Sequence, residues 1–165
     1  MATIEPNPNR PGGYLLRDSV VVPGSLEEVF AFFSNALNLE EMTPPQMGFK
    51  VLTPGPLEMR VGLLIDYKIT VMGLPARWRS EITVWEPGVR FVDEQRRGPF
   101  RYWEHEHTFE QIEGESGPAV RVGDHIQYAV PGGPLAPLVH RLHVSGLNQR
   151  VFAHRRKVLQ SRFGG

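Results

Sequence analysis

An alternation of apolar and polar residues between Val89 and Gln111 constrains the fold of this chain more than any other feature of its sequence. It is interrupted once, at Arg97-Gly98-Pro99-Phe100, where glycine allows unusual backbone angles and proline fixes φ. Successive side chains of a β-strand point to opposite faces of a sheet, so the pattern predicts two strands joined by a tight turn. The face that carries Trp103 and Phe109 is the apolar one, and we expect it to face inward.

The same inward face also carries polar residues in its middle, namely Asp93, Gln95, His105 and His107. Buried polar groups are costly unless they find hydrogen-bond partners, and a ligand can supply such partners. A face that is apolar at its ends and polar in its middle therefore predicts the wall of a ligand cavity rather than plain core.

Two short helices are expected after the first strand, which is predicted over 14–22. Ser25 with Glu28 three residues later is a capping-box pattern and predicts a helix over 26–34. A second helix is predicted over 35–42, because the prolines that follow cannot continue it.

The remaining strands follow one another closely, which predicts an antiparallel meander. Besides the hairpin, they are predicted over 48–53, 63–72, 76–85 and, after the polar loop 113–118, over 119–130. The last strand should point four side chains inward, namely Asp124, Ile126, Tyr128 and Val130.

The helical pattern after Pro134 changes phase along its length. One apolar stripe comprises Leu135, Leu138, Val139 and Leu142. A second, rotated around the helix, comprises Leu147, Val151 and Val158, with Phe152 and Leu159 alongside. Because a straight helix would bury only one stripe, we predict a kink near Ser145-Gly146. The basic run 154–157 is interpreted as a solvated face near a helix C-terminus, with an anionic partner as the alternative.

The composition narrows the function classes. Eighteen basic side chains match eighteen acidic ones, which argues against nucleic acid as a partner. Absence of cysteine excludes a thiolate metal site and a cysteine nucleophile. No apolar run approaches the length of a membrane span, so no integral membrane segment is predicted.

Domain organisation and location follow from the same composition. Residues 1–13 are polar and rich in Pro and Gly, which predicts a disordered lead-in without a signal peptide, and 14–162 should form one domain. We therefore expect a cytoplasmic protein. Neutral net charge and an exposed edge strand would permit a homodimer.

This order of elements predicts an α+β fold. A curved antiparallel sheet of seven strands cannot cover its own concave face, and only the long C-terminal helix is large enough to do so. The two short helices can close one end, which leaves space for a ligand between sheet and helix.

At this level the sequence resembles the START/SRPBCC superfamily, whose helix-grip fold is shared by polyketide cyclase/dehydrase and coenzyme-Q-binding START-like domains. Within it, the sequence resembles bacterial ligand-binding SRPBCC proteins. The resemblance spans 14 to about 160 and rests on Asn38-Leu39-Glu40, Thr43-Pro44-Pro45, Trp78 with Ile82, Phe91-Val92-Asp93-Glu94-Gln95, Gly98-Pro99, Trp103-Glu104-His105 with His107 and Phe109, Asp124 with Tyr128 and Pro131, and Val151-Phe152 with Arg155. It implies no metal, and no cofactor is predicted.

The predicted partner is a small, largely apolar molecule such as a lipid, an isoprenoid or an aromatic polyketide-like compound. The predicted ligand-binding residues are Tyr67, Trp78, Asp93, Gln95, Trp103, His105, His107, Asp124 and Tyr128. Gln95 has an alternative role, which is to bond the backbone of its own turn.

The sequence leaves three alternatives beside this binding function, which it favours over catalysis. Asp93 and His105 could be the catalytic acid/base pair of a cyclase/dehydrase-type enzyme. Asp93, His105 and His107 could instead form a two-histidine, one-carboxylate metal site, although a hydrogen-bonded pair is preferred. Finally, the domain could be a protein-interaction module with a vestigial cavity. The sequence contains no nucleophile elbow, phosphate loop or zinc helix motif.

Overall fold

An antiparallel sheet of eight strands frames the protein in a computed structural model that describes residues 2–71, 73–115 and 117–164. The strand order is β1-β2-β8-β7-β6-β5-β4-β3. The strands are β1 (Thr3–Pro6), β2 (Tyr14–Pro23), β3 (Lys50–Val51), β4 (Leu64–Val71), β5 (Leu74–Glu86), β6 (Arg90–Arg97), β7 (Tyr102–Gly114) and β8 (Gly117–Ala129). The α+β class and the meander are thereby confirmed, with eight strands where seven were predicted. Met1, Met72 and Ser116, assigned by the sequence to the lead-in, a strand end and a loop, lie outside the described residues.

The additional strand, β1, lies in the segment predicted to be disordered. It pairs antiparallel with β2, from Thr3 opposite Arg17 to Pro6 opposite Tyr14. Ala2 and Asn7 are buried, and the Gln149 side chain of the last helix donates to the Ala2 carbonyl at 2.7 Å. The prediction of disorder is therefore wrong, because the free edge of β2 offers backbone partners that composition alone does not reveal.

Two short helices connect β2 to β3, as predicted. Helix α1 (Leu26–Phe33) begins at Ser25, whose side chain accepts a hydrogen bond from the Glu28 backbone while the Glu28 carboxylate accepts one from the Ser25 backbone. Helix α2 (Asn38–Met42) is shorter than predicted, and the 3₁₀ turn η1 (Pro45–Met47) follows it.

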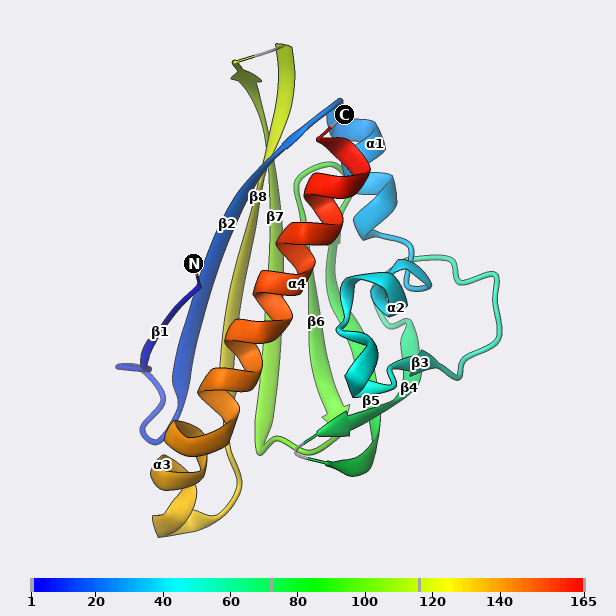
Figure 1. The fold of residues 1–165 in the computed structure, drawn as a ribbon. Helices are drawn as coiled ribbons and strands as arrows, with labels where there is room; N and C mark the ends of the chain where they lie inside the picture. The colour runs from blue at the N-terminus through cyan, green and yellow to red at the C-terminus, as the bar shows by residue number, and fades with distance from the viewer. Residues whose placement is uncertain (1, 72, 116, 165) are drawn as a thin grey trace.

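The C-terminal helical region is irregular at its beginning. It comprises η2 (Gly133–Leu135), α3 (Ala136–Val139), the π-helical segment η3 (His140–Val144) and the long helix α4 (Ser145–Phe163). The π-helical segment lies directly before Ser145, where a break was predicted. Helix α4 crosses one face of the sheet, which curves around it (Figure 1). None of the described helices is long and apolar enough to span a membrane.

Two expectations for this region are corrected. Three leucines of the first apolar stripe, Leu135, Leu138 and Leu142, are exposed rather than buried. The basic run is not uniformly solvated, because Arg155 is 7% exposed and the neighbouring Arg156 pairs with the buried Asp18. The three leucines before the phase change therefore lie outside the core, and the helical region does not bury two complete stripes.

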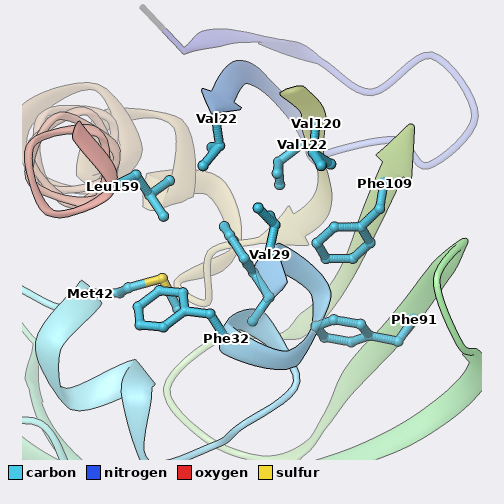
Figure 2. Packing of buried hydrophobic residues seen from close by; sticks show 10 residues of the cluster. Val22, Val29, Phe32, Met42, Phe91, Phe109, Val120, Val122 and Leu159 are labelled. Atoms are coloured by element: carbon cyan, nitrogen blue, oxygen red, sulfur yellow. The ribbon is translucent and has the colours of Figure 1, made fainter. Parts of the chain in front are cut away.

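One end of the space between sheet and helices is filled by apolar side chains (Figure 2). We call this cluster the packed end; it consists of Val22, Val29, Phe32, Phe33, Met42, Phe91, Phe109, Val120, Val122 and Leu159. The side chains come from β2, α1, α2, β6, β7, β8 and α4, and none is more than 6% exposed. Helix α1 supplies two of its four rings, and β6 and β7 supply the other two.

Candidate functional site

A cavity of about 160 Å³ lies between the sheet and α4, next to the packed end. Its walls are formed by β4 to β8, by α4 and by the segment from the end of α1 to η1. Most lining side chains are apolar or aromatic. A cavity of about this volume is large enough to hold a molecule of the size of benzene.

Six of the nine predicted binding residues line this cavity, namely Tyr67, Trp78, Asp93, Trp103, His105 and His107. The three residues Tyr67, Trp78 and Trp103 form a continuous aromatic wall. The rings of Tyr67 and Trp78 stack at 5.7 Å between centroids, and Trp103 meets Trp78 edge to face at 5.4 Å.

The other three predicted residues are placed elsewhere. Gln95 bonds the backbone of its own turn, donating to the Phe100 carbonyl at 2.8 Å and accepting from the Phe100 amide at 3.2 Å. This corrects its assignment as a ligand-orienting residue in favour of the alternative role. Tyr128 is fully buried, and its hydroxyl bonds His140 Nε2 at 2.8 Å. Asp124 lies behind the histidines and contacts them from the side away from Asp93.

Asp124 is the centre of a buried group of charges. Its Oδ1 accepts hydrogen bonds from Arg155 Nη1 at 2.6 Å and from His105 Nε2 at 2.7 Å. The same oxygen lies 3.2 Å from His107 Nδ1. Strand pairing explains the arrangement, because β7 and β8 place His107 directly opposite Asp124. We call Asp93, His105, His107, Asp124 and Arg155 the polar cluster.

Arg155 is a buried residue of the cavity wall that the prediction of the binding residues did not include. It was assigned to a solvated basic run, yet it shares one helical stripe with three other buried residues, Asn148, Phe152 and Leu159. The spacing of three and four residues from Phe152 and Leu159 is the signal that could have identified it.

Asp93 faces the two histidines from the neighbouring strand β6. Its Oδ2 lies 3.5 Å from His107 Nε2 and 3.9 Å from His105 Nδ1. Its Oδ1 accepts from Ser80 Oγ at 3.2 Å, and Ser80 in turn bonds the Tyr67 hydroxyl at 2.9 Å. The expected pairing of Asp93 with His105 is therefore corrected, since the closer carboxylate to His105 is Asp124.

The two histidines have different protonation properties. Burial and the neighbouring His107 lower the pKa of His105 to about 4, although both carboxylates act against this. Burial would also lower the pKa of His107, but the Asp124 and Asp93 carboxylates outweigh burial and raise it. His105 is therefore neutral at pH 7. Because the ionised Asp124 accepts from Nε2, that nitrogen carries the proton and Nδ1 keeps its lone pair.

The carboxylates remain ionised. Burial alone would raise the pKa of Asp124, but the Arg155 charge and the histidine contacts hold it well below its usual value. The pKa of Asp93 is likewise lowered, because hydrogen bonding and charge from the histidines outweigh burial.

Three side-chain donors in the cavity wall have no acceptor among the residues that the structure describes. They are Trp78 Nε1, Asn148 Nδ2 and Arg155 Nε, and the ring nitrogen His107 Nδ1 also lacks a hydrogen-bond partner. The four side chains are 4–7% exposed. A buried donor without a partner costs roughly 1–3 kcal/mol, which a ligand oxygen would recover.

Several solved structures share this fold. They include Zhui aromatase/cyclase from Streptomyces sp. R1128 (15% identity, TM-score 0.68, covering 93% of this chain and 98% of that one). A START superfamily protein from Mycobacterium smegmatis matches with 14% identity, a TM-score of 0.60 and coverage of 91% and 97%. Ginseng major latex-like protein 151 from Panax ginseng matches with 11% identity, a TM-score of 0.64 and coverage of 92% and 98%.

At the sequence level, no curated protein matches the chain. A family described as "Polyketide cyclase / dehydrase and lipid transport" matches residues 22–152, which extend from the end of β2 into α4 and include most of the cavity wall. With the START-like helix-grip fold of its structural neighbours and this match over most of its length, the chain belongs to the polyketide cyclase / dehydrase and lipid transport family.

Proposed function

We propose that the protein binds a small, largely apolar molecule that carries a hydrogen-bond-accepting oxygen. The apolar walls provide the affinity, at about 25 cal/mol for each Å² of apolar surface removed from water. The cavity of about 160 Å³ accommodates one aromatic ring or a short branched chain. A lipid, isoprenoid or aromatic polyketide-like ligand would place a part of about that size inside the cavity.

The observation that carries the proposal is a set of three buried donors without acceptors, Trp78 Nε1, Asn148 Nδ2 and Arg155 Nε, in a largely apolar wall. Native proteins pair nearly all such groups, and the exceptions call for an explanation. A carbonyl, hydroxyl or carboxylate oxygen of a ligand would pair with them. The open cavity also supports ligand binding over the interaction-module alternative, for which the aromatic side chains are expected to fill it.

A second candidate function, catalysis of a cyclase or dehydrase type, is favoured by the state of His105. Asp124 holds its Nε2–H, and the unprotonated Nδ1 remains available in the cavity wall. A histidine oriented in this way can remove a proton next to a substrate carbonyl. Asp124, rather than Asp93, would then be the partner of the base.

The first experiment is mass spectrometry of the freshly purified full chain, both native and after denaturation and solvent extraction. The proposal expects a co-purified organic molecule with at least one oxygen. The identified compound is then tested with His105→Asn: a carrier retains binding with altered affinity, whereas an enzyme loses turnover and keeps binding.

A second experiment tests the donors with defined probes, acetophenone and α-methylstyrene, which have the same shape but differ in the carbonyl oxygen. Acetophenone should bind about tenfold more tightly to the wild type, and Trp78→Phe should weaken that preference. Trp85→Phe is the matched control, because Trp85 does not line the cavity. Equal affinity of both probes for the wild type would contradict the proposal.

A further inference from the structure

We propose that Asp93, His105 and His107 form a binding site for one divalent transition-metal ion in the cavity wall. This goes beyond the proposed binding of an organic ligand, and it does not depend on it. One ligand atom from each of the three residues lies within 4.8 Å of the other two. Two imidazoles and one carboxylate are a donor set that suits zinc, iron(II), cobalt(II) and nickel(II).

The donor atoms face one another at separations close to those of a coordinated ion. Asp93 Oδ2 lies 3.5 Å from His107 Nε2 and 3.9 Å from His105 Nδ1. Ligands at about 2.1 Å from a tetrahedral ion are roughly 3.4 Å apart. Small side-chain rotations that draw the donors together would therefore complete the coordination geometry.

The backbone positions these donors without help from a loop. His105 and His107 are two residues apart on β7, so both point to the same face of the sheet. Asp93 on β6 is directly opposite His105. All three positions are thus fixed by the pairing of two neighbouring strands.

Asp124 lies next to the ring nitrogens of His105 and His107 that point away from the proposed ion. Its Oδ1 accepts from His105 Nε2 at 2.7 Å and lies 3.2 Å from His107 Nδ1. A metal-binding histidine characteristically gives its other N–H to a carboxylate, which fixes the tautomer and the ring orientation. Here Asp124 accepts from His105 and lies next to the corresponding nitrogen of His107, and Arg155 fixes the carboxylate at 2.6 Å.

The charge of the polar cluster also favours a cation. With both imidazoles neutral, as metal ligands must be, two carboxylates face one guanidinium, and one negative charge remains in a buried environment. Three protein ligands leave at least one coordination position, and that position opens to the cavity, because all three residues line it.

The test uses the full chain, expressed without a polyhistidine tag and dialysed against EDTA. Zn²⁺ is titrated by calorimetry, and Co²⁺ by its visible absorption, which reports the coordination geometry. We expect one ion per chain, and a higher Tm with Zn²⁺. Asp93→Asn, which preserves the shape of the most exposed of the three ligands, and His107→Gln should each lower the affinity by more than about 100-fold.

The control is a triple variant, His125→Gln with His143→Gln and His154→Gln, which removes three histidines that are exposed or partly exposed. It should keep wild-type stoichiometry and affinity. Loss of binding in this variant would show adventitious surface binding only, and it would overturn the proposal. Failure of the folded wild type to bind one ion, or unchanged binding in the circular-dichroism-verified Asp93→Asn protein, would overturn it as well.

Discussion

The packed end and the cavity are built on the same inward face of the same strand, yet one is solid and the other hollow. On β7, Phe109 belongs to the packed end, while His105 and His107 line the cavity. The difference comes from the opposite layer. Helix α1 supplies Phe32 and Phe33 to the packed end, whereas the cavity is covered by α4 and by the segment from the end of α1 to η1. An alternating strand therefore creates either core or cavity, depending on the volume that the covering helix supplies.

The two regions also differ in polarity. The packed end contains only apolar side chains, whereas the polar cluster buries two carboxylates, two imidazoles and a guanidinium beside the cavity. Replacing a buried ion pair by apolar groups is often neutral or stabilising, so such a group is weak evidence for stability. Four of its five members line the cavity, which supports the proposed role in binding.

The largest expected effect comes from removing the only guanidinium of the polar cluster. Arg155→Met should lower the free energy of unfolding by about 3–5 kcal/mol, because Asp124 is then a buried charge without its strongest counter-ion. Urea unfolding followed by circular dichroism measures this. Arg79→Met is the control: Arg79 makes a bidentate pair with Asp66 at 2.8 Å, but both are more than 40% exposed, so the loss should stay below about 1 kcal/mol. Equal losses of unfolding free energy in Arg155→Met and Arg79→Met would mean that Arg155 is effectively solvated.

A matched pair of leucines on α4 compares the two regions directly. Leu159 is 1% exposed in the packed end, and Leu147 lines the cavity. Leu159→Ala should cost about 2–5 kcal/mol, because it opens a void in a close-packed cluster. Leu147→Ala should cost only about 1 kcal/mol, because its side chain already borders empty space and loses fewer contacts. Thermal unfolding of both variants tests this, and a larger loss for Leu147→Ala would contradict the distinction between a solid and a hollow end.

The smallest expected effect concerns His140, which belongs to the π-helical segment η3 and does not line the cavity. It stacks on Tyr14 at 3.4 Å between centroids and bonds the Tyr128 hydroxyl. Burial lowers its pKa below the ordinary value of 6.5. Below about pH 6.5 the unfolded chain therefore takes up a proton that the folded chain resists, and stability is lost as the pH falls.

His140→Gln should reduce this acid sensitivity, by at most about 2 kcal/mol when stability at about pH 5 is compared with stability at neutral pH. The measurement is urea unfolding at both pH values. If His140→Gln loses as much stability between the two pH values as the wild type does, this histidine titrates equally in the folded and unfolded states.

Local patterns in the sequence determined most of the architecture. The alternation around Trp103 and His105, the Gly98-Pro99 turn and the capping box at Ser25 each depend on neighbouring residues only, so each could be interpreted without the structure. They predicted the meander, the first short helix and the polar middle of the inward face. The phase change after Pro134 likewise located the helical irregularity to within a few residues.

Only the tertiary structure decided which polar groups meet. The short distances from Asp124 to His105 and Arg155 join β8, β7 and α4, and no spacing in the sequence encodes where a helix lies on a sheet. The strand β1 and the partner of Arg155 were likewise not predicted. The segment of β1 is ordered by pairing with β2 and by the Gln149 contact from α4 to Ala2, and Arg155 is paired with Asp124 on β8. The contacts that involve α4 form only when the helix packs on the sheet.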